Sequence, residues 1–254
     1  MEGFEAYISS NGYLVIPSYN LNFLIDFNES NIPSMPETVE ATAKPAGADG
    51  DIVLKTTYEP IPFNIVCYTE DNLSVANKLL LEQKLNNFLN TTKNSTIKLG
   101  FQAQEKFYNV KYSGVLTTTR YPAHLRFEIP LKSSESYAKS TTESSITGNG
   151  SKISSTIKEV GAVFTINGPA TTPKISFNNY EMEYSNDLLE GEKLTIDSKK
   201  STITHTTALN VSTNAMRYYN HQFPKVENGT NTLAVVSGIS SASQVNVKWY
   251  DLKF

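Results

Sequence analysis

The sequence predicts a mainly β protein made of two domains, and three observations lead to this prediction. Its 254 residues include 26 Ser, 26 Thr and 24 Asn, together with 14 Tyr and 12 Phe, but a single Trp. β-Branched and aromatic side chains favour the pleated surface of a strand. Short segments in which apolar and polar residues alternate recur along the chain, whereas one stretch alone has the spacing of a helix. A Ser/Thr-rich stretch near the middle separates the two halves.

The first unusual segment, residues 31–51, is rich in Pro and Gly and has almost no apolar periodicity. A loop of this length inside a compact domain is uncommon and often functional. Two interpretations stay open: a surface loop without fixed structure, or an arm that becomes ordered against a neighbouring subunit. The residues assigned to such an oligomer arm are Met35, Pro36, Pro45, Gly47 and Gly50.

Three later segments of the first half alternate between apolar and polar side chains. This pattern predicts strands with one buried and one solvent-facing side. The apolar positions are Phe63, Ile65 and Cys67 in the first segment, Ile97, Leu99 and Phe101 in the second, and Leu125, Phe127, Ile129 and Leu131 in the third.

A single helix is predicted between the first two of these strands, over residues 73–90, with Asp71, Asn72 or Ser74 as its N-terminal cap. Its apolar residues form two stripes that point to different sides at about 100° per residue. We therefore expect the helix either to be covered on more than one side or to pack its second half elsewhere. The stripes are Leu73, Ala76 and Leu80, and Leu81, Leu85, Phe88 and Leu89.

The stretch 133–151 has few large aliphatic residues and ends in Gly148-Asn149-Gly150. This composition is typical of a linker, and it predicts two domains, residues 1–140 and 141–254. The second half shows short strand candidates separated by turn signals, without a convincing helix, which favours a β-sandwich. The strand candidates are residues 162–166, 174–178, 180–184, 193–197, 203–211, 232–236 and 244–250.

Charge and composition exclude several classes of protein. The formal net charge is −3, and the 12 basic and 16 acidic residues of 1–145 and the 10 and 9 of 146–254 give neither half the strong positive field of a nucleic-acid-binding protein. The apolar runs are too short to span a bilayer. No basic segment precedes them as in a secretory signal, so we expect cytoplasmic synthesis. The single Cys67 rules out an internal disulfide and a cysteine-cluster metal site.

No motif in the sequence predicts catalysis, a metal or a cofactor. The three histidines lack the spacing of a metal site, and there is no HExxH, P-loop or GxSxG motif. The carboxylate pairs 181/183 and 190/192 are typical of solvated faces rather than of a glycosidase cleft. Cys67 lies on an apolar strand face, which indicates a buried thiol rather than a nucleophile. We predict that the protein is not an enzyme.

One patch of the second half has the residue types of a carbohydrate site. Tyr218, Tyr219 and His221 stand beside Arg217 and Asn220, and aromatic faces with such polar neighbours can stack on sugar rings. The alternative is that these residues belong to the ordinary core and rim of a sandwich. The single tryptophan alternates with two valines, so we expect it to be buried. We therefore predict weak or no glycan binding by this domain.

Several motifs follow one another in a particular order. In the first half, GADGD (47–51) is followed by YEPIPF (58–63), the single helix, LGF (99–101), FYNVKYSG (107–114) and LRFEIPL (125–131). In the second half come NG (167–168), TPKI (172–175), LEGEKLTID (189–197) and FPKVENGTNTL (223–233). Taken in this order, over nearly the whole chain, they resemble the distal tail proteins of long non-contractile-tailed bacteriophages. The closing stretch departs from that pattern, because it is short and lacks a basic, aromatic-rich final strand.

The resemblance implies a structural virion protein. Distal tail proteins form a hexameric ring between the tail tube and the tail tip, and the ring lumen continues the DNA channel. The resemblance implies an N-terminal tail-tube-like β-sandwich with one helix and an extended belt. It implies a C-terminal galectin-like or carbohydrate-binding-module-like sandwich, which serves for docking and in some relatives binds sugar. The implied partners are further copies of the chain, the tail tube protein, a tail-tip or tail-associated protein and a receptor-binding protein, while DNA passes without specific binding.

The residues themselves fit this interpretation and leave two others open. An acidic first half suits a channel through which DNA must pass, because carboxylates repel phosphate. The rival is a carbohydrate-binding adhesin or host-recognition module, which predicts a signal peptide and a monomer. A polysaccharide-degrading sandwich enzyme ranks third.

Overall fold

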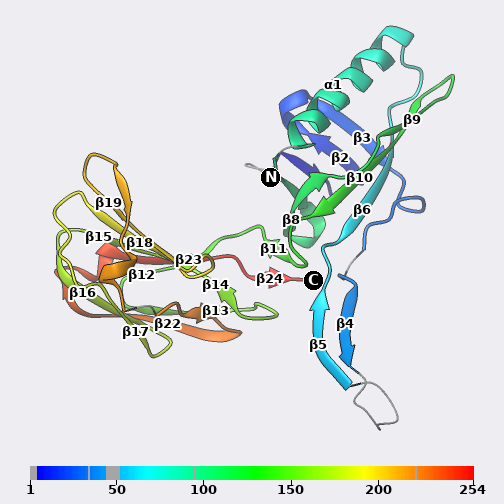
Figure 1. The fold of residues 1–254 in the computed structure, drawn as a ribbon. Coiled ribbons are helices and arrows are strands. Elements are labelled where there is room, and N and C mark those ends of the chain that lie inside the picture. Colours follow the sequence, from blue (N-terminus) through cyan, green and yellow to red (C-terminus); the bar gives the residue numbers. More distant parts are fainter. Residues whose placement is uncertain (1–4, 34, 44–51, 94, 221) are drawn as a thin grey trace. The chain divides into compact units, whose positions relative to one another are not determined.

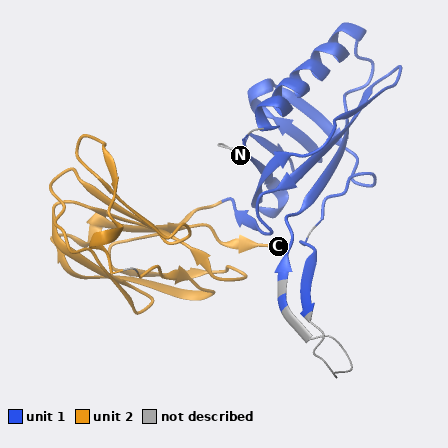
Figure 2. Ribbon diagram, in the orientation of Figure 1, with its two compact units in different colours: residues 1–141, 254 blue, residues 142–253 orange. Residues whose placement is uncertain are grey.

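The computed structural model describes residues 5–33, 35–43, 52–93, 95–220 and 222–254 (Figure 1). The chain divides into two compact units, of which unit 1 comprises residues 1–141 and 254 and unit 2 residues 142–253 (Figure 2). Both are built mainly of strands, as predicted, and α1 (Val75–Lys93) is the one α-helix among the described residues. None of the described helices has the length and apolar character needed to cross a membrane.

The body of unit 1 is one continuous sheet that closes on itself. Its strands are β1 (Ala6–Ile8), β2 (Tyr13–Ile16), β3 (Leu21–Ile25), β6 (Pro62–Tyr68), β7 (Ile97–Phe101), β8 (Lys106–Tyr112), β9 (Thr117–Arg120), β10 (Leu125–Ser133) and β11 (Ala138–Ser140). They follow the order β11-β8-β7-β1-β2-β3-β6-β10-β9, and a further pairing of β8 with β10 closes the circle. Neighbours run antiparallel except β1 and β7, which are parallel.

This closed sheet differs from the two-layer sandwich expected for the first half. Alternating apolar residues show that one side of each strand is buried. They do not show whether the cover is a second sheet or the same sheet curved round on itself, as in a barrel. The pairing of β8 with β10 depends on contacts between distant parts of the chain, which local periodicity does not reveal.

The core of unit 1 lies on the inner side of the sheet and is closed by α1. Every apolar position predicted for the three alternating segments is buried, which confirms the strands β6, β7 and β10. The rings of Phe63 and Tyr108 meet edge-on with centroids 5.1 Å apart. Leu85, Phe88 and Leu89 of α1 belong to the same core.

The helix α1 confirms one of its three cap candidates. Ser74 Oγ accepts a hydrogen bond from the backbone N–H of Asn77 at 3.2 Å. Of the two apolar stripes, the second is buried, with Leu85 fully inaccessible, whereas Leu80 of the first is 49% exposed. Within the described residues the helix is therefore covered on one side, and its second half packs on the core.

Unit 2 is a sandwich of two sheets with a core of its own. The strands of the larger sheet, in spatial order, are β12 (Ser144–Thr147), β23 (Val245–Trp249), β15 (Val163–Asn167), β18 (Lys193–Asp197), β19 (Thr202–Thr206) and β20 (Ser212–Asn214); those of the smaller sheet are β13 (Gly150–Ser154), β22 (Gly229–Ile239), β16 (Ala170–Phe177) and β17 (Tyr180–Glu183). The rings of Phe164 and Phe177, one from each sheet, pack with their centroids 5.1 Å apart. Trp249 is 2% exposed, as its alternation with valines predicts.

The Ser/Thr-rich stretch is not the irregular linker that its composition indicates. It includes β11 and β12 and the start of β13. Ile146 is buried and pairs with Val247 of β23, while its neighbours Ser145 and Thr147 face solvent. In β12 the outward positions therefore carry hydroxyl side chains, and the low aliphatic content of the stretch hides its strands. The boundary between unit 1 and unit 2 falls between Thr141 and Thr142. Independent folding of the two predicted domains stays a prediction.

The remaining elements are short or stand apart from these sheets. They are the hairpin strands β4 (Thr38–Ala43) and β5 (Ile52–Tyr58), the strand pair β14 (Val160–Gly161) and β21 (Lys225–Val226), β24 (Leu252–Lys253), and the 3-10 helices η1 (Pro17–Tyr19), η2 (Gln102–Gln104), η3 (Met216–Tyr218) and η4 (Ala242–Gln244).

Candidate assembly site

A hairpin arm, formed by β4 and β5, projects from the body of unit 1 (Figure 1). Its strands pair antiparallel, from Thr38 opposite Tyr58 to Ala43 opposite Ile52. The side chains of residues 37–42 are all exposed, including Val39 at 43%. Residues 38–43 thus form a strand inside the segment expected to be a loop. A two-stranded hairpin without further cover is marginally stable in water.

The structure places two of the five residues assigned to the arm. Met35 is 55% exposed, whereas Pro36 is buried where the chain leads into β4. Pro45, Gly47 and Gly50 lie outside the described residues. The role of all five residues in oligomer contacts stays a prediction.

The end of β5 and the residues after it are fixed to the body at the end of β10 and just after it. The ring of Tyr58 meets that of Tyr137 edge-on, with centroids 5.4 Å apart. Ser136 Oγ donates a hydrogen bond to the carbonyl of Tyr58 at 2.7 Å, and Ser133 Oγ accepts one from the backbone N–H of Ile61 at 2.7 Å. Burial, with the nearby Tyr58, raises the pKa of Tyr137, so this phenol is neutral at physiological pH.

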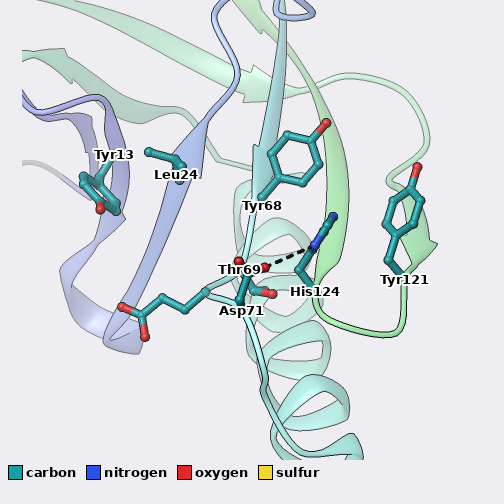
Figure 3. Close-up of a pocket in the computed structure, with 8 residues that line it drawn as sticks. Tyr13, Leu24, Tyr68, Thr69, Asp71, Tyr121 and His124 are labelled. Carbon is teal, nitrogen blue, oxygen red and sulfur yellow. Dashed lines mark ion pairs between the residues drawn. The ribbon is translucent and has the colours of Figure 1, made fainter.

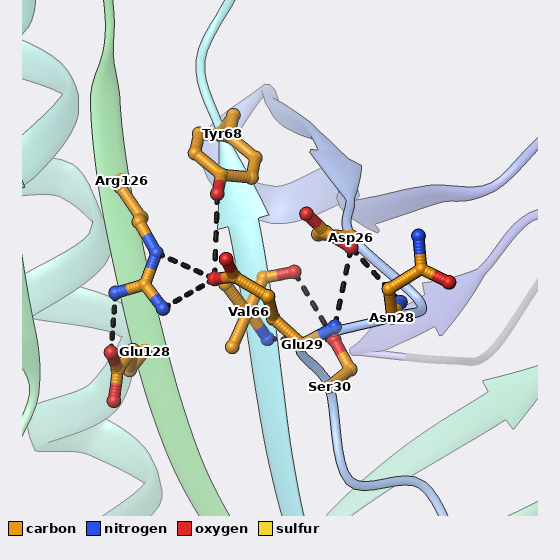
Figure 4. A network of polar contacts seen from close by, with 8 residues as sticks. All are labelled: Asp26, Asn28, Glu29, Ser30, Val66, Tyr68, Arg126 and Glu128. Carbon is orange, nitrogen blue, oxygen red and sulfur yellow. Dashed lines mark hydrogen bonds and ion pairs between the residues drawn. The ribbon is translucent and has the colours of Figure 1, made fainter.

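The segment that leads from β3 towards the arm is held by a guanidinium (Figure 4). Arg126 of β10 donates from Nε and Nη2 to one carboxylate oxygen of Glu29, at 3.0 and 2.6 Å, and from Nη1 to Glu128. Its side chain is 17% exposed. The hydrogen bonds with Glu128 and Glu29 raise the pKa of Arg126 above its ordinary value. Charge-assisted bonds of this kind are stronger than neutral ones.

Glu29 is presented to Arg126 by a tight turn. Asp26 Oδ1 accepts hydrogen bonds from the backbone N–H groups of Asn28 and Glu29, at 2.9 and 3.2 Å, which is an Asx-type turn. Ser30 Oγ then accepts from the N–H of Val66 at 2.9 Å and donates to its carbonyl at 3.2 Å (Figure 4). Both ends of the arm therefore start from fixed points on the body.

A groove of about 470 Å³ lies at the carboxyl-terminal end of β6 (Figure 3). His124 packs against two aromatic rings, with centroids 5.2 Å from Tyr68 and 4.8 Å from Tyr121. Its Nδ1 is 3.3 Å from Asp71 Oδ1. Aromatic faces beside carboxylates suit a cationic group of a partner. The lining residues are Tyr13, Leu24, Tyr68, Thr69, Glu70, Asp71, Tyr121 and His124.

The residues assigned to carbohydrate binding do not form an open aromatic plate where they are described. Tyr219 is 4% exposed, its hydroxyl donates to the carbonyl of Gln222, and burial raises its pKa. Tyr218 is half-buried, and the guanidinium of Arg217 lies 4.3 Å from its ring centroid. His221 lies outside the described residues. Sugar binding by this patch stays a prediction.

The other candidates from the sequence have structural roles in the described part of the chain. Cys67 is buried, and burial raises its pKa. Glu192 accepts a hydrogen bond from the backbone N–H of Leu189, and this bond lowers the pKa of the Glu192 carboxyl group. Glu192 Oε2 also lies 3.1 Å from Nε2 of His205. Glu181 pairs with Lys174 at 2.7 Å. Among the described residues no cluster of three or more His, Cys, Asp or Glu could hold a metal.

Sequence reasoning did not find the residues that anchor the arm. Arg126 and Glu128 stand two positions apart on the polar side of a predicted strand, which places their side chains next to each other. The partner Glu29 is 97 positions away in the chain, however, and no local pattern connects the two. Tyr137 and Ser133 belong to the stretch that composition assigned to a linker.

Comparison with known proteins agrees with this architecture. Residues 16–133 match the family model described as phage tail protein RIFT-related domain. The fold is similar to that of the Dit (gp 19.1) protein of phage SPP1, described as a paradigm of the hub adsorption apparatus, with a TM-score of 0.68 and 7% identity over 92% of this chain and 97% of that one. A search of curated proteins gave no match.

A second similar structure comes from the baseplate of phage P2 in its activated conformation with calcium. The TM-score is 0.53 at 10% identity, over 94% of this chain and 93% of that one. At such identities the likeness is one of fold. The domain family and the fold together confirm the resemblance to distal tail and baseplate hub proteins that the sequence predicts.

Proposed function

We propose that this chain, whose residues 16–133 form a phage tail protein domain, is a structural virion protein that makes a ring at the distal end of a phage tail. The ring joins the tail tube to the tail tip and continues the DNA channel. The observation that carries the proposal is the hairpin arm, which is rooted in the body at both ends while the side chains of residues 37–42 in its first strand are exposed. The fold shared with SPP1 Dit supports the same role.

Use of the arm by a neighbour is compatible with a ring. A contact between the arm of one copy and the body of the next is heterologous, and such a contact generates a ring when the rotation between copies closes and an open filament when it does not. Packing on a neighbouring sheet also gives the hairpin the cover that it lacks in a single chain. We assign six copies, the number that the resemblance implies.

For the channel, the acidic balance of the first half supports passage of DNA without binding. Residues 1–145 carry 16 acidic and 12 basic side chains. Carboxylates on the lumen would repel phosphate and keep the DNA free to move.

We assign unit 2 the role of a galectin-like docking domain for tail-tip and receptor-binding proteins. Sugar recognition by Tyr218, Tyr219 and His221, as in an adhesin, is the alternative. Burial of Tyr219 and the position of Arg217 over Tyr218 favour docking, because a sugar site needs an accessible aromatic face with convergent polar groups.

Native mass spectrometry of the full chain, with negative-stain electron microscopy, tests the proposal. We expect a six-copy species and rings with a central channel. A chain that stays monomeric across the accessible concentration range would favour the adhesin alternative instead.

A further inference from the structure

Two oppositely charged surfaces lie at opposite ends of the outer face of the unit 1 sheet. Tyr68 pairs with Arg126 at one end of the β6–β10 ladder, and Pro62 pairs with Lys132 at the other. The strand between Pro62 and Tyr68 spans roughly 20 Å at the usual rise per residue. Arg126 and Lys132 are separated by an even number of positions, so their side chains lie on the same face of the sheet.

The first surface is the groove of Figure 3, and its charge is negative. Glu70 and Asp71 line it and are exposed, with 72% of the Asp71 side chain accessible. Tyr68 and Tyr121 provide aromatic faces beside these carboxylates. A lysine side chain can satisfy both features, since its ammonium group pairs with carboxylates and interacts favourably with aromatic faces.

The cations around this groove have other partners. Arg126 is held by Glu29 and Glu128. Arg120 pairs with Glu82 at 2.9 Å, and Lys78 Nζ donates to two backbone carbonyls, at 3.1 and 2.6 Å. In the part of the chain that the structure describes, neither groove carboxylate forms an ion pair with a lysine or an arginine.

The second surface is a pair of lysines on neighbouring strands. Lys111 of β8 lies directly opposite Lys132 of β10, and both are exposed. They line a shallow hollow together with Tyr112 and Ser113. No described carboxylate forms an ion pair with either lysine. Like charges directly opposite each other destabilise a sheet, so the pair favours an acidic surface of a partner as its neighbour.

We infer that the Glu70–Asp71 groove of one copy receives the Lys111–Lys132 pair of the next copy. This inference rests on the ring proposed above and names one of its contacts. One chain cannot join its own two surfaces, because the strands of the sheet hold them roughly 20 Å apart. Opposite charges at the two ends of one sheet instead suit a head-to-tail contact, the kind that generates a ring.

Charge reversal on the full chain tests this contact. The K111E/K132E variant carries acidic groups on both surfaces, and the E70K/D71K variant carries basic groups on both. We expect each variant alone to lose the ring, with subunit dissociation constants raised by roughly tenfold or more, because like charges then face each other. An equimolar mixture should restore the ring with equal numbers of both variants, since alternating copies are again complementary. Native mass spectrometry measures the loss of the ring in each variant and its restoration in the mixture.

A control variant separates the contact from a general effect of charge. K152E/K193E changes the net charge by the same amount as K111E/K132E, on lysines of unit 2 that form no ion pair among the described residues. Its ring should match the wild type. Thermal unfolding of every variant checks that loss of the ring is not loss of the fold.

The outcomes distinguish this contact from the proposed ring. A wild-type ring whose mass is unchanged by both reversals overturns the contact and leaves the ring intact. A ring that both reversals break but the mixture does not restore also overturns the contact, because the two surfaces then have other partners. A wild-type chain that is monomeric at every concentration overturns both proposals.

Discussion

Arg126 holds the turn that precedes the arm. Its guanidinium joins Glu29, in the turn before the arm, to Glu128 on its own strand. The sequence predicts that Arg126 lies on the polar face of a strand, but the identity of its partner depends on the fold of β3 against β6. Local periodicity therefore predicted the position of this residue and not its function.

Replacing Arg126 should weaken unit 1 more than replacing another paired arginine. In Arg126→Met, Glu29 and Glu128 lose their shared counter-charge and the hydrogen bonds that the largely covered guanidinium donates to them, so we expect the free energy of unfolding to fall by about 1–3 kcal/mol. The matched control is Arg120→Met, whose side chain is 65% exposed beside Glu82 and whose surface ion pair contributes little. Urea unfolding followed by circular dichroism compares them, and equal losses would contradict the assigned role.

Tyr108 carries a buried hydroxyl for which no hydrogen-bond partner exists among the described residues. Burial raises its pKa from 10.0 to about 12. Because the phenol ionises first in the unfolded chain, its contribution to stability is complete below pH 10 and is lost as the pH rises towards 12.

Tyr108→Phe should therefore stabilise the protein, by up to about 1 kcal/mol at neutral pH, because a polar group no longer has to be buried. The variant should also lose less stability than the wild type between pH 10 and 12. Thermal unfolding across this pH range measures both effects, with Tyr180→Phe, at a half-exposed ring of unit 2, as the control. A destabilised Tyr108→Phe would show that the hydroxyl has a partner.

Secondary-structure elements were predictable where one face is buried and the other is wet. The segments that became β6, β7 and β10 alternate clearly, and α1 begins two residues after its predicted start. The strand of the arm, residues 38–43, escaped prediction because no described side chain from 37 to 42 is buried, so its sequence has no apolar face. The strand β12 escaped because hydroxyl side chains occupy its outward positions, and β13 escaped because its one aliphatic side chain, Ile153, is 75% exposed rather than buried.

The two stripes of α1 should differ sharply in their contribution to stability. Leu89 is 2% exposed in the core, so Leu89→Ala should cost about 2–5 kcal/mol through lost burial and a cavity. Leu80 is 49% exposed, and Leu80→Ala should cost less than about 1 kcal/mol in the isolated chain. Chemical unfolding of the two variants measures this difference. Similar losses would mean that the first stripe is covered as well.

At the scale of the whole molecule, the described residues form two separate cores, and each belongs to one unit. Composition predicted a division near residue 140, and it also identified residues 31–51 as unusual. It could not predict how the arm is anchored, because Glu29 meets Arg126, and Tyr58 meets Tyr137, only in the folded sheet. The residues assigned to carbohydrate binding were chosen for their residue types. Residue type does not indicate how a side chain packs, so it could not predict that Tyr219 is buried.

A fragment of residues 142–253 should fold alone. It contains both sheets of the sandwich and every residue of the second core, so the burial that stabilises it requires no residue of unit 1. Far-UV circular dichroism should show a β spectrum with a cooperative thermal transition. A disordered spectrum without a transition would reject the predicted domain boundary.

The proposed ring depends on the arm. Glu37 and Glu59 are joined by a backbone hydrogen bond of 2.9 Å at the base of the arm, so residues 38–57 can be replaced by a short Gly-Ser link without opening the body. The most direct measurement is native mass spectrometry of the intact and armless chains side by side. We expect six copies for the intact chain and mainly monomers for the armless one, both with a β spectrum. An armless chain that still forms the six-copy ring would contradict this expectation.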